Sequence, residues 1–153
     1  MGREKPGKPR RPRPEASAHA HEGFDIPDDF EHPGGRHIDN KLLGNLTGAA
    51  FDGCTSCQDP LLTLMVEDPT TTARLVELAC VGVHNMLGGG LPASMTDDAV
   101  PGQSSPEFRR LARAGLDGSN DAMFHECEQM TQSQRRAAAN TALDTLVGQL
   151  SMG

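Results

Sequence analysis

The chain has 153 residues, a length typical of one domain, and only 36 % of them are apolar. Its aromatic residues are five Phe, with no Trp or Tyr, so the predicted core consists mainly of Leu, Val, Met and Ala. The net charge is −7, yet residues 1–14 alone carry +5 and the remaining residues −12. An acidic body repels phosphate-rich partners, which leaves residues 1–14 as the basic segment with which nucleic acid would interact.

The cysteine content and the N-terminus predict a cytoplasmic protein. Four cysteines are too few for a disulfide-stabilised secreted scaffold, and the basic N-terminus is followed by prolines instead of an apolar signal segment. The longest apolar run, residues 61–66 with Thr63 inside it, is far too short to cross a bilayer, so we expect no membrane span.

Residues 1–37 are predicted to be a disordered tail and linker. Residues 5–14 alternate basic residues with proline, a composition typical of an extended, polyproline-like segment. Residues 17–37 remain irregular, and Phe24, Ile26 and Phe30 are the large apolar side chains there. These three residues form either a strap lying on the folded domain or a linear motif offered to a partner.

Residues 38–151 are predicted to form an all-α domain, a small irregular bundle of five to six helices. Asp39 is an N-cap candidate for a helix over about 40–51. Asp59 and Asp68 each precede a proline, which is favoured at the first helical position, and predict helices over 60–67 and 69–87. The shorter of these two segments is also compatible with a buried strand.

Three further helices are predicted over about 106–114, 120–130 and 132–150. Ser104 with Glu107, and Thr131 with Gln134, have the spacing of capping boxes at the starts of the first and third of these helices. No stretch has the alternating pattern of an amphipathic strand, which supports an all-α fold.

One group of residues has the composition of a metal site. Cys54 and Cys57 lie in the loop before the predicted 60–67 helix, while Cys80 and His84 share one face of the 69–87 helix. If these two helices pack antiparallel about a turn at Asp68, all four side chains lie at similar heights and converge. Three thiolates and one imidazole are a common tetrahedral ligand set, so this arrangement predicts a structural zinc ion.

Other interpretations of these residues remain open. Cys80 lies on an apolar helix, where a cysteine often packs as a small hydrophobic side chain. Cys54 and Cys57 are also compatible with a redox pair, although no strand precedes them as in thioredoxin-type sites. Cys127 falls on the apolar face of its helix and is predicted to be a core residue.

Five arginines are the concentrated basic groups of the domain: Arg109, Arg110, Arg113, Arg135 and Arg136. If the two helices that carry them are neighbours, they form a patch for phosphate or an acidic partner. The alternative is that they lie on solvated helix faces.

The sequence therefore favours a non-enzymatic helical adaptor or regulatory protein, stabilised by zinc at Cys54, Cys57, Cys80 and His84. It would bind a protein partner through the tail or the segment 24–30, with nucleic acid as a second partner for residues 1–14. The first alternative is a thiol- or metal-responsive sensor that uses the same four residues. The second is a small enzyme whose active site is not identifiable from the sequence.

Overall fold

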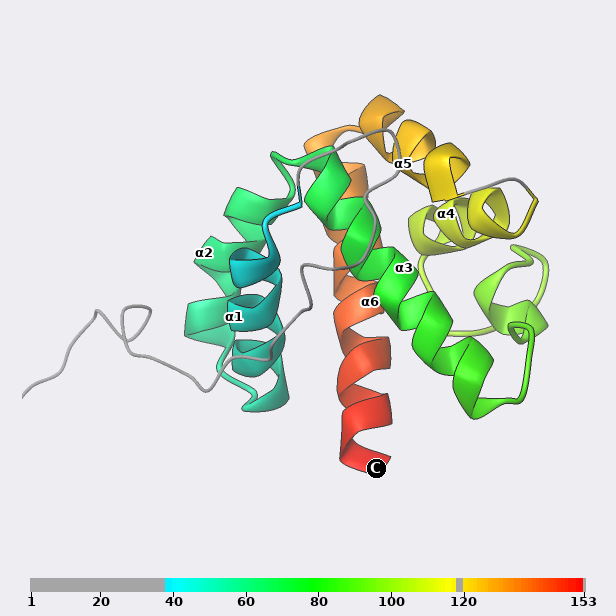
Figure 1. Ribbon diagram of the computed structural model, residues 1–153, viewed down its shortest axis with the longest axis horizontal. Coiled ribbons are helices and arrows are strands. Elements are labelled where there is room, and N and C mark those ends of the chain that lie inside the picture. Colours follow the sequence, from blue (N-terminus) through cyan, green and yellow to red (C-terminus); the bar gives the residue numbers. More distant parts are fainter. Residues whose placement is uncertain (1–37, 118–119, 153) are drawn as a thin grey trace, which may run out of the picture.

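The computed structural model describes residues 38–117 and 120–152. In these residues the regular structure is entirely helical, which confirms the predicted all-α bundle (Figure 1). The helices are α1 (Asn40–Phe51), α2 (Thr55–Met65), α3 (Pro69–Met86), the short 3-10 helix η3 (Ala93–Met95), α4 (Pro106–Asp117), α5 (Asn120–Gln129) and α6 (Gln132–Met152). The predicted tail, residues 1–37, lies outside the described residues.

Helices α3 and α6 pack side by side through the middle of the domain (Figure 1). Helices α1 and α2 lie together on one side of this pair, and α4 and α5 lie on the other. The six α-helices of the described residues all contribute to one hydrophobic core, in which Phe108 and Phe124 are the largest fully buried side chains. The core therefore contains two of the five Phe residues in addition to the predicted Leu, Val, Met and Ala.

Three of the predicted helix starts are confirmed with their capping residues. The Asp39 carboxylate accepts a hydrogen bond from the third amide of α1 at 3.0 Å, and Asp68 accepts from two amides of the first turn of α3. Thr131 and Gln134 form a reciprocal capping box, in which the amide of each residue donates to the side chain of the other at 2.9 and 3.1 Å. These bonds satisfy amides that have no acceptor within the helix.

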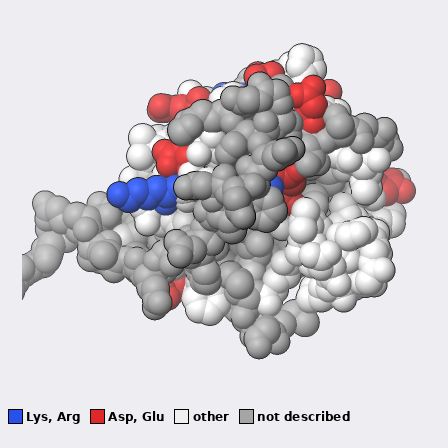
Figure 2. Space-filling model, viewed as in Figure 1, with Lys and Arg blue, Asp and Glu red and all other residues white. Residues whose placement is uncertain are grey.

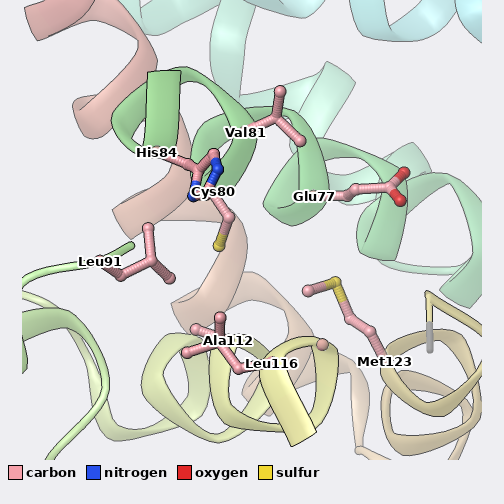
Figure 3. Close-up of a pocket in the computed structure, with 9 residues that line it drawn as sticks. Glu77, Cys80, Val81, His84, Leu91, Ala112, Leu116 and Met123 are labelled. Atoms are coloured by element: carbon pink, nitrogen blue, oxygen red, sulfur yellow. The ribbon is translucent and has the colours of Figure 1, made fainter. Parts of the chain in front are cut away.

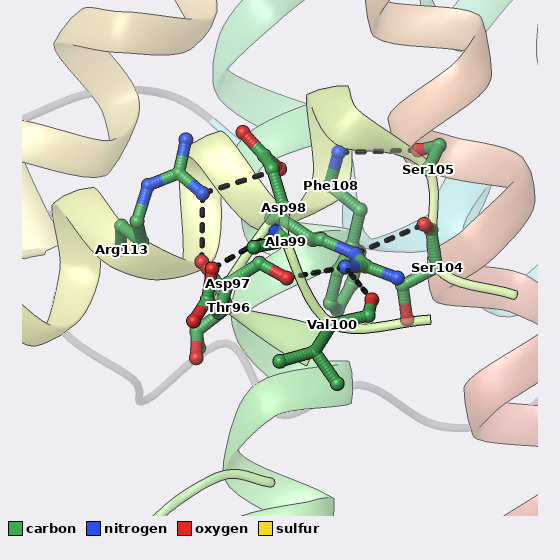
Figure 4. A network of polar contacts seen from close by, with 10 residues as sticks. Thr96, Asp97, Asp98, Ala99, Val100, Ser104, Ser105, Phe108 and Arg113 are labelled. Carbon is green, nitrogen blue, oxygen red and sulfur yellow. Dashed lines mark hydrogen bonds and ion pairs between the residues drawn. The ribbon is translucent and has the colours of Figure 1, made fainter. Parts of the chain in front are cut away.

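The capping residue of α4 is Ser105 and not the predicted Ser104. The Ser105 hydroxyl accepts from the Phe108 amide at 3.1 Å (Figure 4). Pro106 occupies the first helical position, where its missing N–H has no cost, and this places the cap one residue before it.

Helix α2 begins at Thr55, five residues before the predicted start, and includes Pro60 within it. The predicted N-cap at Asp59 was therefore wrong. The Cys54 carbonyl accepts bonds from the amides of Cys57 and Gln58 at 3.2 and 3.0 Å, so the helix is established before the proline is reached. Pro60 is solvent-exposed, where water can replace the single hydrogen bond that proline removes. Cys57 consequently lies on a helix and not in a loop.

The five arginines do not form a free basic patch. Arg109 and Arg135 are only 4 % and 8 % exposed, and both donate to backbone carbonyls. Arg110 pairs with Glu126, Arg113 with Asp98 and Arg136 with Asp59. Figure 4 shows Arg113 reaching both Asp98 and the carbonyl oxygen of Thr96, which anchors the loop before α4 to that helix. The patch is therefore not formed. Arg109 and Arg135 are buried, whereas Arg110, Arg113 and Arg136 lie on helix surfaces in ion pairs with these carboxylates.

Within the described ranges, no helix combines the length and the apolar character needed to cross a bilayer.

Candidate functional site

Cys54 lies at the junction between α1 and α2 and is held from both sides. Its amide donates to the Ala49 carbonyl at 2.9 Å, and Gly53, at φ 72°, donates to the Ala50 carbonyl at 3.0 Å. This pair of bonds is the Schellman arrangement that ends many helices, with glycine in the left-handed conformation. Because the Cys54 carbonyl also begins α2, the backbone of this residue is fixed at the end of one helix and the start of the next.

The two thiols of this junction lie close together. Cys57 occupies the third position of α2 and is 3 % exposed, while Cys54 is half-buried. Burial, a side-chain hydrogen bond with Cys54 and the charge of Cys54 together raise the pKa of the Cys57 thiol. The Cys54 Sγ also lies 3.5 Å from the Ser56 hydroxyl. The structure thus brings the first half of the predicted ligand set together.

Cys80 and His84 line a cavity of about 150 Å³ between α3, α4 and α5 (Figure 3). Figure 3 shows Cys80 Sγ directed toward Ala112 of α4, with Met123 of α5 across the cavity. The complete lining consists of Glu77, Cys80, Val81, His84, Leu91, Ala112, Gly115, Leu116 and Met123. The predicted shared face of Cys80 and His84 is therefore correct, but this face contacts α4 and α5.

The polar groups of this cavity are already committed. The amide of Gly90 donates to Nδ1 of His84 at 2.7 Å, so Nδ1 is an acceptor and the proton of the neutral ring lies on Nε2. Glu77 forms a buried ion pair with Arg74, one turn earlier on α3. Burial, followed by the charge of Glu77, raises the pKa of Cys80 to about 12. At neutral pH Cys80 is a protonated thiol, which is a poor nucleophile.

The four predicted zinc ligands do not converge in the described part of the chain. No group of three or more His, Cys, Asp or Glu residues there lies in a position to hold a metal ion. Cys54 and Cys57 lie at the α1–α2 junction, while Cys80 and His84 line the cavity between α3, α4 and α5. Helices α1 and α2 lie on one side of α3, and α4 and α5 lie on the other (Figure 1). One zinc ion bound by all four would require α2 to pack along α3, and the zinc set stays a prediction.

The mouth of the cavity is apolar and exposed. Val81 and Leu116 line the cavity and remain about half exposed. Residues 78–96 contain no Lys, Arg, Asp or Glu. In Figure 2 uncharged side chains gather at the lower right of the molecule, where α3 ends. The long uncharged run was the sequence signal of this surface, but the sequence does not show that α4 completes a cavity beside it.

A second, more open hollow of about 510 Å³ adjoins this mouth. It is lined by Thr96, Asp97, Asp98, Arg113 and Leu116, so Leu116 separates the two depressions. Both aspartates are exposed, and only Asp98 is paired with Arg113. The apolar cavity is thus flanked by an acidic edge.

Cys127 is fully buried in the core, as predicted. Burial is the main cause that raises its pKa to about 12.

The segment 24–30 and the basic residues 1–14, the predicted binding elements of the tail, lie outside the described residues. Comparison of the chain with protein-family models, curated proteins and solved structures gave no match.

Proposed function

We propose that this protein is a non-enzymatic helical adaptor or regulatory protein that binds a protein partner at the cavity between α3, α4 and α5. The observation that carries this proposal is an apolar cavity whose rim, Val81 and Leu116, is left exposed. Exposed apolar surface around a cavity is typical of a binding site. A partner that covers this surface removes it from water, which is energetically favourable.

The size of the cavity favours one side chain over a whole ligand. Small-molecule sites usually enclose roughly 300–1,000 Å³, whereas this cavity encloses about 150 Å³. A single Leu, Met or Phe side chain of a partner fits a space of this size. Such anchor residues, buried in a pocket and surrounded by weaker contacts, contribute most of the binding energy in many protein interfaces.

The charges near the cavity favour a basic partner segment. Residues 38–153 contain 14 acidic and seven basic side chains, and six of the seven basic ones contact carboxylates or carbonyls within the domain. Asp97 and Asp98 add an acidic edge next to Leu116. A segment with one large apolar residue beside Lys or Arg therefore matches both depressions.

Binding is favoured over catalysis because the only thiol in this cavity is unreactive. A cysteine nucleophile requires a thiolate, and the pKa of Cys80, about 12, keeps it protonated at neutral pH. Glu77 and His84 are engaged by Arg74 and the Gly90 amide, so neither is positioned to remove the proton from Cys80.

Selection of peptides from a phage-displayed random library on the full-length chain tests the proposal. The selected peptides are expected to share one large apolar residue beside basic residues. Leu116→Glu should weaken their binding by about tenfold or more, because it places a charge at the mouth of the cavity. The matched control is Leu64→Glu on α2, since Leu64 and Leu116 are 56 % and 57 % exposed. Equal binding to both variants, or no enriched peptide, would refute the proposed site.

Zinc is a separate part of the proposal and has its own test. Metal analysis of the purified chain, followed by chelation and circular dichroism, distinguishes the cases. One tightly held zinc per chain, lost together with helicity, would support the set Cys54, Cys57, Cys80 and His84. If the purified chain is helical and contains no metal, the zinc proposal is refuted, whereas the proposed docking site is unaffected.

A further inference from the structure

Cys54 and Cys57 lie across the first turn of α2 in a geometry that suits a disulfide. The amide of Cys57 donates to the Cys54 carbonyl at 3.2 Å, which closes a backbone turn between them. The ends of such a turn have Cα atoms less than about 7 Å apart, and a disulfide joins Cα atoms about 4.4–6.8 Å apart. A bond between their sulfur atoms therefore requires no change in the course of the helix.

We propose that Cys54 and Cys57 are a redox-active pair that forms a reversible intrachain disulfide by exchange with a low-molecular-weight disulfide. This site is independent of the docking surface, because it lies at the α1–α2 junction and not between α3, α4 and α5. It is an alternative to the zinc set, because the same two thiols cannot bind a structural zinc ion and form a disulfide at once.

Exposure assigns different roles to the two thiols. Cys54 is half-buried and is the sulfur that solvent-borne disulfides can reach. Cys57 is 3 % exposed and is reached only through Cys54. Cys54 is thus the attacking cysteine, and Cys57 is the resolving cysteine that acts on the mixed disulfide.

The exchange proceeds in two balanced steps. Cys54 loses its proton to solvent, and the thiolate attacks one sulfur of the small disulfide; its S–S bond breaks, and one small thiolate leaves and is protonated. Cys57 then loses its proton and attacks the Cys54 sulfur, and the second small thiolate leaves. In total, two protein thiols are oxidised to one disulfide, and the small disulfide is reduced to two thiols.

The other two cysteines are unsuited to this chemistry. Cys80 and Cys127 lie on different helices, and burial is the main cause that raises the pKa of each to about 12. They serve as internal controls, since they should stay reduced under the same conditions.

The test uses the full-length reduced chain incubated with oxidised glutathione, alkylated with iodoacetamide and digested with trypsin. Cleavage after Lys41 and Arg74 gives one peptide, residues 42–74, that contains Cys54 and Cys57 and neither Cys80 nor Cys127. This peptide should lose two hydrogens, take up no alkyl group and become fully alkylated after reduction. The reaction must give no disulfide between chains and must leave the chain helical.

Two variants test the roles. Cys57→Ala should accumulate glutathione at Cys54, while Cys54→Ser should give at least about tenfold less modification of the peptide than Cys57→Ala, because Cys57 is shielded. Circular dichroism confirms that each variant is folded. The proposal is overturned if the native peptide remains doubly alkylated, if both cysteines carry glutathione, or if the disulfide joins two chains.

Discussion

Replacement of Arg135 should destabilise the domain strongly. Its buried guanidinium donates to Val66 at the end of α2 at 2.7 Å, to Cys127 in α5 at 3.1 Å, and to Met130 just after α5. The helix dipoles place partial negative charge at these ends, so they stabilise a cation that has no carboxylate partner among its hydrogen bonds. One side chain of α6 therefore holds the ends of two other helices.

The loss of stability expected on replacing Arg135 follows from these three hydrogen bonds. Arg135→Met keeps the aliphatic part of the side chain but leaves three carbonyls without this donor. At about 1.5 kcal/mol for each bond to a charged donor, the free energy of unfolding falls by about 4–5 kcal/mol. A domain of this size has roughly 5–15 kcal/mol in total, so the variant would be marginally folded. Arg135→Lys, which keeps the charge but not the fork of donors, should recover part of the loss.

Arg136→Met is the matched control because Arg136 is the next residue on α6. Its ion pair with Asp59 is exposed and should contribute less than about 1 kcal/mol, decreasing further at high salt. Urea unfolding of the full-length chains is followed by far-ultraviolet circular dichroism, since the sequence has no Trp or Tyr for fluorescence. If both variants lose similar stability, or if high salt removes the effect of Arg135→Met, the three hydrogen bonds to carbonyls do not make this contribution to the free energy of unfolding.

Three further predictions concern a cap, two thiols and a loop. Asp68→Ala removes the acceptor for two amides of α3 and should lower the unfolding free energy by about 1–2 kcal/mol in the same urea assay, whereas no measurable change would contradict its capping role. Cys80 and Cys127 ionise near pH 9 when unfolded and near 12 when folded, so above pH 9 the unfolded state binds fewer protons and stability should fall by about 1.4 kcal/mol per pH unit for each thiol. The chain has no Tyr and few Lys to obscure this decline, and stability constant from pH 8 to 10.5 would contradict it. Arg109→Met should expose the segment 96–104 to limited proteolysis, because Arg109 binds the carbonyls of Val100 and Ser104 at 2.7 and 3.1 Å; unchanged cleavage would show that other contacts hold the loop.

Local interactions are what the sequence by itself determined. The starts of α1, α3 and α6 depend on side chains that bond to amides two or three residues away, so Asp39, Asp68 and the Thr131–Gln134 box were identifiable without knowledge of the rest of the fold. The end of α3 was equally local, since Gly88, Gly89 and Gly90 all adopt positive φ. Helical periodicity also placed Cys80 and His84 on one face.

The tertiary structure decided which of these local features meet. Periodicity shows which face of a helix is apolar, but not which neighbour covers it, because many helices offer similar apolar faces. Cys80 and His84 therefore face α4 and α5, although the sequence allowed an antiparallel pairing with α2. The role of Arg135 was likewise hidden, since its acceptor at Val66 is 69 residues away and is a backbone carbonyl, which no residue type marks in the sequence.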